Sequence, residues 1–269
     1  EENRTILSAL LRARIDLMSD LNPETFHQKF IVLDPERYNA AVLTGSTNFT
    51  PTGVGSNLNH VVIIRSKRIA ALYKEEFIEA WTGVSDPDRS IHDSSPREYG
   101  ISGIRVKTLF APDHAPEMEM MKQMLKAKKR IDFAIFTFAQ SSGIDDTLIC
   151  LARNGIQIRG ILDRMQGNQK WSATKPLIKA GAELYWPKRE SGVRKVHHKL
   201  MVIDKSVVIA GSFNFTEPAN MLNNENILVI GKHDESDVEA RSSQKAFAAC
   251  ALKEIERIIS TLSEKVNFA

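Results

Sequence analysis

Two short segments of this 269-residue chain carry the same residue types at the same spacing, His-x-Lys-x4-Asp. Their members are His27, Lys29 and Asp34 in the first copy and His197, Lys199 and Asp204 in the second. Imidazoles titrate near neutral pH, so two of them can supply a nucleophile and a general acid. Two lysines can hold the oxygens of a phosphoryl group and stabilise the charge that develops there. Together these groups meet the requirements for breaking a phosphodiester bond.

Each motif opens an apolar segment, 30–33 or 200–203, that we expect to form a β-strand. Alternate residues of a strand share a face, so the histidine and lysine of each motif should project the same way. The aspartates that end these segments, Asp34 and Asp204, complete the candidate catalytic set. Their place at a strand end is also typical of simple turn formers.

A second segment, Gly-Ser-x-Asn, is repeated downstream of each motif, at 45–48 and 211–214. The His-x-Lys-x4-Asp motif recurs after 170 residues and the Gly-Ser-x-Asn segment after 166. An insertion at 35–38 accounts for the difference of four. Hydroxyl and amide groups can bind phosphate where a glycine permits close backbone approach. The candidate phosphate-binding residues are therefore Lys29, Lys199, Ser46, Asn48, Ser212 and Asn214.

Strands and helices alternate around both copies, which indicates an α/β protein. A strand and then a helix follow each motif, at 60–82 in the first copy and at 226–263 in the second. Upstream, residues 10–17 match 177–184 as a helix end followed by a strand. The chain therefore repeats its fold as well as its motifs.

The second copy has a front half, strand-helix-strand-helix-strand between residues 104 and 163, for which the first copy has no room. We therefore predict the latter half of a first domain at 1–83, a linker at 84–103 and a complete second domain at 104–269. The linker is rich in Ser, Asp, Pro and Gly. We expect a longer parent chain or a partner to supply the ~100 residues of the missing half. The oligomeric state is left open.

Composition and the absence of certain segments limit the class of protein. Hydrophobic residues make up 42% of the chain and charged residues 26%, which is ordinary for a globular protein. No apolar run approaches the roughly 18 residues of a membrane span, and no signal-like segment is present. We therefore expect a soluble protein and favour the cytoplasm. Neither motif has nearby cysteines or clustered carboxylates, so we expect no metal and no other cofactor.

The doubled motif resembles the signature of the phospholipase D superfamily, His-x-Lys-x4-Asp followed by Gly-Ser-x-Asn. The resemblance covers about 104–263 and about 7–82, which is most of the chain. It implies two α-β-α sandwich domains related by a pseudo-twofold axis, with both motifs at one cleft and the first domain lacking its N-terminal half here. It also implies metal-independent cleavage, in which one histidine forms a covalent phosphohistidine and the other protonates the leaving group.

Carried over to this sequence, the resemblance makes the motif histidines catalytic, the lysines phosphate-binding and the aspartates structural or orienting. In members with two motifs the first histidine is often the nucleophile, which favours His27. Members often place a glutamate after Gly-Ser-x-Asn to orient a histidine; the second copy has Glu225 there and the first has Asn59. An amide accepts the imidazole proton but does not stabilise imidazolium as a carboxylate does, so we expect the two histidine pKa values to differ.

Nucleic acid is favoured over phospholipid as the substrate, because the second copy looks most like the small nuclease and cardiolipin-hydrolase branch. A phosphate backbone would be followed by the basic residues Lys188, Arg189, Arg194 and Lys195. Lys170 and Trp171 can add charge and stacking. Met165 or Trp186 can equally supply the apolar rim that a phospholipid requires, so a phospholipid hydrolase or transphosphatidylase is the alternative. A silent phosphate-binding module is a minor third possibility.

Overall fold

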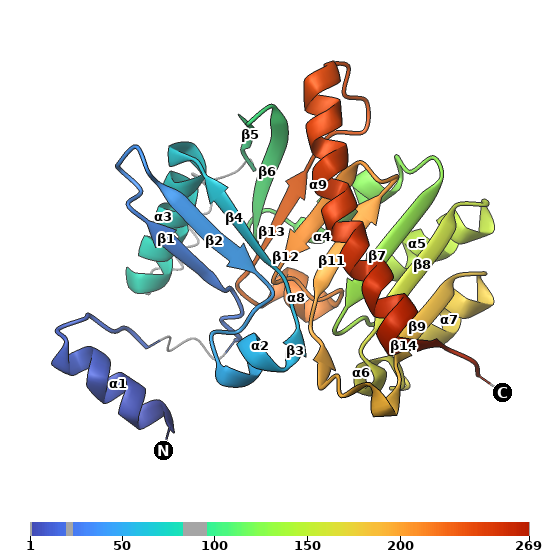
Figure 1. Ribbon diagram of the computed structural model, residues 1–269, viewed down its shortest axis with the longest axis horizontal. Helices are drawn as coiled ribbons and strands as arrows, with labels where there is room; N and C mark the ends of the chain where they lie inside the picture. Colours follow the sequence, from blue (N-terminus) through green and yellow to red (C-terminus); the bar gives the residue numbers. More distant parts are fainter. Residues whose placement is uncertain (1, 20–23, 83–95, 269) are drawn as a thin grey trace.

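A nine-stranded mixed sheet forms the centre of the computed structural model, which describes residues 2–19, 24–82 and 96–268 (Figure 1). Strands β7, β8 and β9 run parallel, joined by helices, and the other neighbours pair antiparallel. Across the sheet the order is β14 (Ser263–Lys265), β9 (Glu183–Pro187), β8 (Gln157–Leu162), β7 (Arg130–Ile135), β11 (Lys199–Ile203), β12 (Val207–Gly211), β13 (Glu225–Ile230), β6 (Ile104–Ala111) and β5 (Glu98–Ile101).

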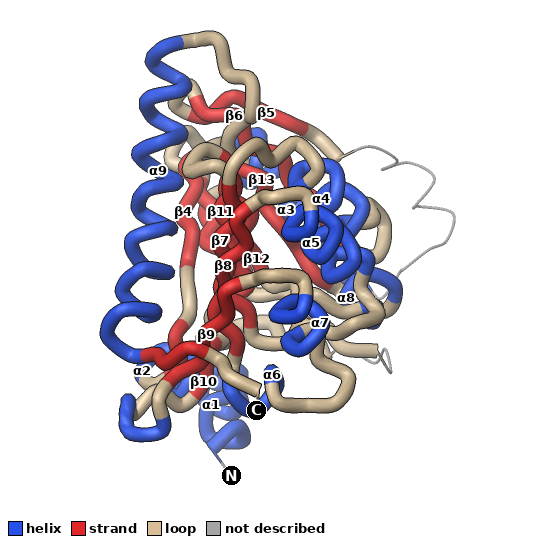
Figure 2. Tube along the Cα trace, turned by 90° about the vertical axis from the view of Figure 1, so that its right-hand side faces the viewer, coloured by secondary structure: helices blue, strands red, loops and turns tan. Residues whose placement is uncertain are grey.

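Helices cover both faces of this sheet (Figure 2). On one face lie α4 (Pro116–Met124), α5 (Gly143–Arg153) and α7 (Thr174–Lys179). The other face is crossed by α9 (Val238–Arg257), which continues as a π-helical turn (Ile258–Leu262). The connecting loops contain α6 (Arg164–Gly167), α8 (Glu217–Met221) and a 3-10 turn (Arg189–Ser191). No helix in the described ranges is both long enough and apolar enough to span a bilayer.

Burial on both faces explains why β11 is apolar at every position after its lysine. Met201 and Ile203 pack under α4, α5 and α7, whereas Leu200 and Val202 face the core shared with α9. A strand covered on both sides reads as a continuous apolar run rather than an alternating one. The start of this strand, which carries the second motif, is therefore firmly anchored.

A smaller antiparallel sheet contains the first motif (Figure 1). Its strands are β1 (Phe30–Leu33), β2 (Ala41–Gly45) and β4 (Val61–Arg65), and α3 (Lys67–Thr82) packs on one face. The core of this unit is continuous with the core under α9. The remaining elements of the first unit are α1 (Glu2–Arg12), α2 (Pro51–Gly55) and β3 (Asn57–Leu58).

The two antiparallel units have the same strand register. Leu33 pairs with Ala41 at the end of the β1–β2 hairpin, and Ile203 pairs with Val207 at the corresponding point of the β11–β12 hairpin. The first turn is four residues longer, as the insertion at 35–38 predicts. Each motif therefore enters its hairpin at the same position, which places the two histidines in equivalent settings.

The two units differ in what covers their second face. Ile31, Leu33 and Ile63 expose 50%, 54% and 61% of their surface, whereas Met201 and Ile203, at positions matching the first two, are buried under helices. Among the described residues, α3 is thus the helix that covers the small sheet, and it covers one face. The second face of the small sheet is therefore largely exposed in the described part of the chain.

Two predicted boundaries differ from the structure. Residues 98–101, inside the predicted linker, form β5 at the edge of the large sheet, because Tyr99 and Ile101 pack against the core under α9. The rest of the predicted linker, 83–95, lies outside the described residues. The predicted helix before residue 13 is present as α1, but residues 13–17 form no strand. The matching strand β9 is held between β8 and β14, and the described part of the first unit offers no such neighbours.

Asp204 lies at the opposite end of β11 from the motif histidine, about 20 Å away at roughly 3.3 Å per strand residue. Its carboxylate accepts hydrogen bonds from the backbone N–H groups of Lys128, Lys129 and Arg130 at 2.6, 2.9 and 2.9 Å. These bonds fasten the start of β7 to the end of β11. The structure therefore corrects the inclusion of Asp204 among the catalytic residues and supports a structural role.

Asp34 occupies the matching position after β1 and accepts a hydrogen bond from the Asn39 side chain at 2.9 Å. It is likewise at the end of its strand remote from the motif histidine, so the same correction applies to Asp34. Both aspartates have positive φ angles, 44° for Asp34 and 50° for Asp204, which suits a turn that leaves a strand.

We predict that Asp204→Ala lowers the free energy of unfolding by about 2 kcal/mol more than Asp34→Ala, because three backbone hydrogen bonds are lost instead of one. Both variants place alanine at a positive φ, so that penalty cancels in the comparison. Urea unfolding of the two variants measures the difference. Equal losses of stability would contradict the anchoring role of Asp204.

Candidate active site

The two motif histidines face one another across a short gap. The imidazole ring centroids of His27 and His197 lie 6.5 Å apart, with the ring planes at 68°. Reacting atoms approach to about 3–3.5 Å before a bond forms, so one phosphoryl group fits between an attacking and a protonating nitrogen. The structure therefore brings the two motifs into one site.

Backbone hydrogen bonds between the units fix the backbone position of each motif histidine. The N–H of His27 donates to the carbonyl of Asn224 at 3.0 Å, and that of His197 donates to the carbonyl of Leu58 at 2.8 Å. Leu58 belongs to β3, which pairs in parallel with β10 (Lys195–Val196). Each histidine is thus held by the unit that does not contain it.

Side-chain hydrogen bonds cross between the units in the same way. His27 Nδ1 lies 2.8 and 2.9 Å from the two carboxylate oxygens of Glu225. His197 Nδ1 lies 2.9 Å from Asn59 Oδ1 and 3.0 Å from the backbone oxygen of Ser46. All these oxygens accept, so each Nδ1 carries a hydrogen and each neutral imidazole keeps its lone pair on Nε2. The sequence indicated that Glu225 and Asn59 orient histidines, but not that each serves the other unit.

Asn59 is itself held in one orientation. Its Nδ2 donates to the carbonyl of Gly53 at 2.7 Å, which leaves Oδ1 facing His197. Ser46 Oγ donates to the same Oδ1 at 3.2 Å and accepts from the backbone N–H of His60 at 3.0 Å. The amide can therefore accept from His197 but cannot place a donor against it.

Ser212 supports Glu225 in the matching way. Its hydroxyl donates to a carboxylate oxygen of Glu225 at 2.5 Å and accepts from the backbone N–H of Asn226 at 3.0 Å. Ser46 and Ser212 are both fully buried, with their hydroxyls committed to the residues that orient the histidines. This corrects the prediction that Ser46 and Ser212 bind phosphate.

The glycines before these serines are required by the neighbouring strand. A Cβ on Gly45 would lie 2.3 Å from the carbonyl oxygen of His60, and one on Gly211 would lie 2.1 Å from that of Asn226. The close approach predicted for Gly-Ser-x-Asn is thus to protein backbone. The asparagines of these segments, Asn48 and Asn214, are partly buried, and within the described chain Asn214 Oδ1 has no hydrogen-bond partner.

Lys29 and Lys199 are buried beside the histidines, and each Nζ donates to the carbonyl of the histidine two residues earlier, at 3.0 Å for Lys199. Burial lowers the pKa of Lys29 to about 8, against the attraction of Glu225. Burial also lowers the pKa of Lys199 well below its usual range, and the positive charge of Lys29 adds to this. Two ammonium groups that have lost water and repel each other strongly favour an anion between them.

The surroundings of His197 favour its neutral form. Burial lowers its pKa to about 3, and the charge of Lys199 acts in the same direction. The backbone oxygen of Ser46 opposes this effect only in part. His197 is therefore neutral at physiological pH.

Three side chains beside the site were missed by sequence reasoning. The rings of His60 and His198 stack 5.5 Å apart, with Nδ1 atoms separated by 3.2 Å, and His198 Nε2 lies 3.6 Å from Glu254. Phe136 follows β7, with its ring centroid 4.9 Å from that of His197. The doubled histidine of the second motif was a signal for His198. Nothing in the motif pattern pointed to Phe136.

The predicted basic segment lies beside the second motif. Arg194 and Lys195 are exposed, and the ammonium of Lys195 lies 5.3 Å from the centroid of the Phe136 ring. Lys188 is partly buried, and Arg189 and Lys170 are exposed. A cationic approach to the site is thus present on this side.

The apolar residues considered for a lipid rim have different settings. Trp186 is not part of a rim, because its ring packs against Phe268 at 6.0 Å and beneath the guanidinium of Arg164 at 4.8 Å. Met165 exposes 74% of its surface and Trp171 exposes 43%. These two side chains remain available to a ligand, whereas the ring of Trp186 is occupied by its contacts with Phe268 and Arg164.

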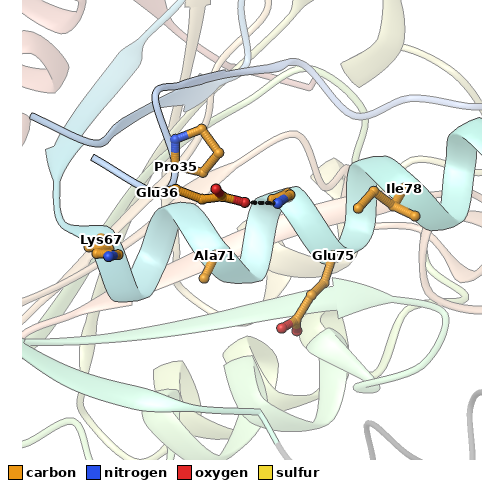
Figure 3. Close-up of a pocket in the computed structure, with 7 residues that line it drawn as sticks. Pro35, Glu36, Lys67, Ala71, Glu75 and Ile78 are labelled. Atoms are coloured by element: carbon orange, nitrogen blue, oxygen red, sulfur yellow. Dashed lines mark hydrogen bonds and ion pairs between the residues drawn. The ribbon is translucent and has the colours of Figure 1, made fainter. Parts of the chain in front are cut away.

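A shallow hollow of about 350 Å³ lies between the β1–β2 turn and α3, at the end of β1 remote from the motif histidine (Figure 3). An ion pair between Glu36 and Lys74 crosses it. Its lining residues are Pro35, Glu36, Lys67, Ala71, Lys74, Glu75 and Ile78. None of the motif residues is among them, so the hollow is not the site of the chemistry.

Comparison with known proteins identifies relatives of both parts of the chain. A family model described as "Cardiolipin synthase, PLD-like domain" matches residues 1–81 and 120–248. Phospholipase D of Rickettsia felis is 32% identical over 156 residues, covering 53% of this chain and 72% of that protein. Mitochondrial cardiolipin hydrolase of Xenopus laevis is 30% identical over 128 residues, covering 48% of this chain and 57% of that protein.

Solved structures share the fold. Nuc from Salmonella typhimurium, described as a phospholipase D family member, superposes with a TM-score of 0.52 at 20% identity, covering 61% of this chain and 99% of Nuc. Phosphatidylserine synthase from Haemophilus influenzae superposes with a TM-score of 0.62 at 13% identity, covering 95% of this chain and 68% of that one. At these identities the superpositions show a common fold.

We predict that Asn59→Glu raises the pKa of His197 by more than one unit from its value of about 3, because a carboxylate stabilises imidazolium and an amide does not. Side-chain NMR of the histidines during a pH titration measures this change. His27, which keeps Glu225, serves as the internal reference. Indistinguishable titrations of the two histidines in the wild type, or of His197 in wild type and variant, would contradict the prediction.

Proposed function

The chain belongs to the family of phospholipase D-like domains and is a phosphodiesterase of that superfamily, and we propose that it cleaves its substrate in two steps through a phosphohistidine. The observation that carries this proposal is the pair of imidazoles 6.5 Å apart, each oriented by a residue of the other unit. Two histidines that share one gap can act on opposite sides of the same phosphorus. A single histidine could not both bond to phosphorus and protonate the leaving oxygen.

His27 is the nucleophile in this proposal. When its Nε2 bonds to phosphorus, the imidazole becomes a phosphorylated imidazolium, and that positive charge persists for the lifetime of the intermediate. Glu225 is fully buried and hydrogen-bonded to His27 Nδ1, so its carboxylate stabilises the charge. The amide of Asn59 beside His197 would stabilise such a charge less. This difference supports His27 as the residue that attacks phosphorus.

His197 then acts as the acid and afterwards as the base. The bond from phosphorus to the leaving oxygen breaks, and that oxygen takes the proton from His197 Nε2. In the second step His197 removes a proton from water, the water oxygen bonds to phosphorus and the bond to His27 breaks. Burial and the charge of Lys199 lower the pKa of His197 to about 3 in the free protein, so we propose that the negative charge of the substrate raises it and allows protonation.

The lysines supply the positive charge for the non-bridging oxygens. Lys29 and Lys199 flank the two histidines, and the side-chain amide of Asn214 can add a donor through its Nδ2. Because ammonium groups provide the charge that a metal ion provides in many phosphodiesterases, we propose that turnover does not require a metal.

We propose nucleic acid as the substrate class. The exposed side chains of Arg194 and Lys195 continue the positive charge outward from the second motif, as a second phosphate of the same strand requires. The exposed face of Trp171 is suited to stacking with a base. Phospholipid is the second candidate, because Met165 is exposed and the relatives above carry the names phospholipase D and cardiolipin hydrolase.

We expect turnover in EDTA, tested in parallel on single-stranded DNA, double-stranded DNA, RNA, cardiolipin and phosphatidylcholine. His27→Ala and His197→Ala should each lower the rate about a thousand-fold or more, because both steps need both groups. Cleavage of lipid alone would move the protein to the phospholipid class with the same mechanism. Absence of turnover on every substrate would contradict the phosphodiesterase proposal and favour the phosphate-binding module.

The covalent intermediate should form on His27. In His197→Asn, a p-nitrophenyl phosphodiester still reacts, because p-nitrophenolate leaves without a proton, but water attack then lacks its base. The phosphohistidine therefore accumulates, and mass spectrometry of peptides after an alkaline quench should place it on His27. The mirror variant, His27→Asn, is the matched control. A label on His197 in that variant would reverse the assignment of roles.

A further inference from the structure

Phe136 contacts residues in and beside the second motif. Its backbone N–H donates to the carbonyl of His198 at 3.0 Å, and this bond fixes the backbone position of Phe136. The ring centroid lies 4.9 Å from that of His197, 5.1 Å from the ammonium nitrogen of Lys199 and 5.3 Å from that of Lys195. One partly buried aromatic ring therefore contacts a catalytic imidazole and two ammonium groups.

Lys199 is difficult to keep charged at its position. It exposes 3% of its surface, so its ammonium group has lost nearly all its water. Two carboxylates favour its charged form, Glu225 on β13 and Asp163 at the end of β8. Two lysines oppose it, Lys29 just before β1 and Lys195 on β10.

A carboxylate in contact with Lys199 would solve this problem but would also cancel the charge that the phosphate needs. The nearby carboxylate of Asp163 is instead committed to the backbone N–H groups of Val196, Met165 and Gln166. The face of an aromatic ring attracts an ammonium group through its quadrupole and carries no net charge. It can therefore hold the lysine charged without neutralising it.

We propose that Phe136 is a positioning residue of the reaction, whose ring holds the ammonium groups of Lys199 and Lys195 charged and aimed at the substrate phosphate beside His197. Phe136 itself does not take part in bond making or breaking. The effect on catalysis rests on the proposed function, whereas the effect on phosphate binding does not.

The direction of the pH effect follows from the charge. The ring stabilises the protonated form of Lys199 and so raises its pKa relative to an aliphatic neighbour. Phe136→Leu should therefore move the alkaline limit of phosphate binding to lower pH, by about 0.5–1 unit for a buried cation–π contact. Phe136→Tyr keeps an aromatic face and should stay within about two-fold of the wild type at all pH values.

The experiment measures binding of inorganic phosphate by calorimetry between pH 6 and 10, and hydrolysis of bis(p-nitrophenyl) phosphate over the same range. Wild type, Phe136→Leu and Phe136→Tyr are compared. The matched control is Phe247→Leu, which changes a partly buried phenylalanine on α9. Urea midpoints of all four proteins separate effects on the site from effects on folding.

We expect Phe136→Leu to bind phosphate about ten-fold more weakly near pH 8 with the shifted alkaline limit, and Phe136→Tyr and Phe247→Leu to behave as wild type. Equal behaviour of the leucine and tyrosine variants, or a loss of affinity without a pH shift, would overturn the proposal. Absence of phosphate binding by the wild type would also overturn it. A ring-dependent alkaline limit without diester hydrolysis would sustain it while the proposed function failed.

Discussion

The carboxylate of Glu225 has no exposed surface, and a buried charge is tolerated only when its hydrogen bonds are satisfied. One partner, Ser212, comes from its own unit, but the other is His27 of the first unit. Separating the units would leave this charge without its imidazole. Packing of the two units and assembly of the site are therefore linked, because one of the contacts that join the units also orients the histidine proposed to attack phosphorus.

The second crossing contact has the same geometry and a different chemistry. Asn59 reaches across to His197 as Glu225 reaches to His27, and the backbone bonds that place both histidines are also related in this way. In the proposed mechanism, the carboxylate suits His27 to a lasting positive charge and the amide suits His197 to giving up a proton. The two units thus place a carboxylate beside one histidine and an amide beside the other, and the proposed division of roles rests on this difference.

Local patterns in the sequence were sufficient for the long elements and for the motif residues. The helix predicted to end at residue 82 and the strand predicted to begin at 104 are both present, because apolar spacing is set within each segment. The crossed pairing was beyond sequence reasoning, since it joins residues 198 positions apart. Ser212 was assigned to phosphate for the same reason: a hydroxyl beside a motif looks available until its buried partner is known. Phe136 carried no signal, because an aromatic residue after a buried strand is ordinary core.

The central claim is that both motifs act on one phosphate. A crystal structure of the protein with tungstate, a tetrahedral analogue of phosphate, tests it most directly. The account predicts a single anion between His27 Nε2 and His197 Nε2, within hydrogen-bond distance of the ammonium groups of Lys29 and Lys199. Separate anions at the two motifs, or one anion that touches a single histidine, would contradict it.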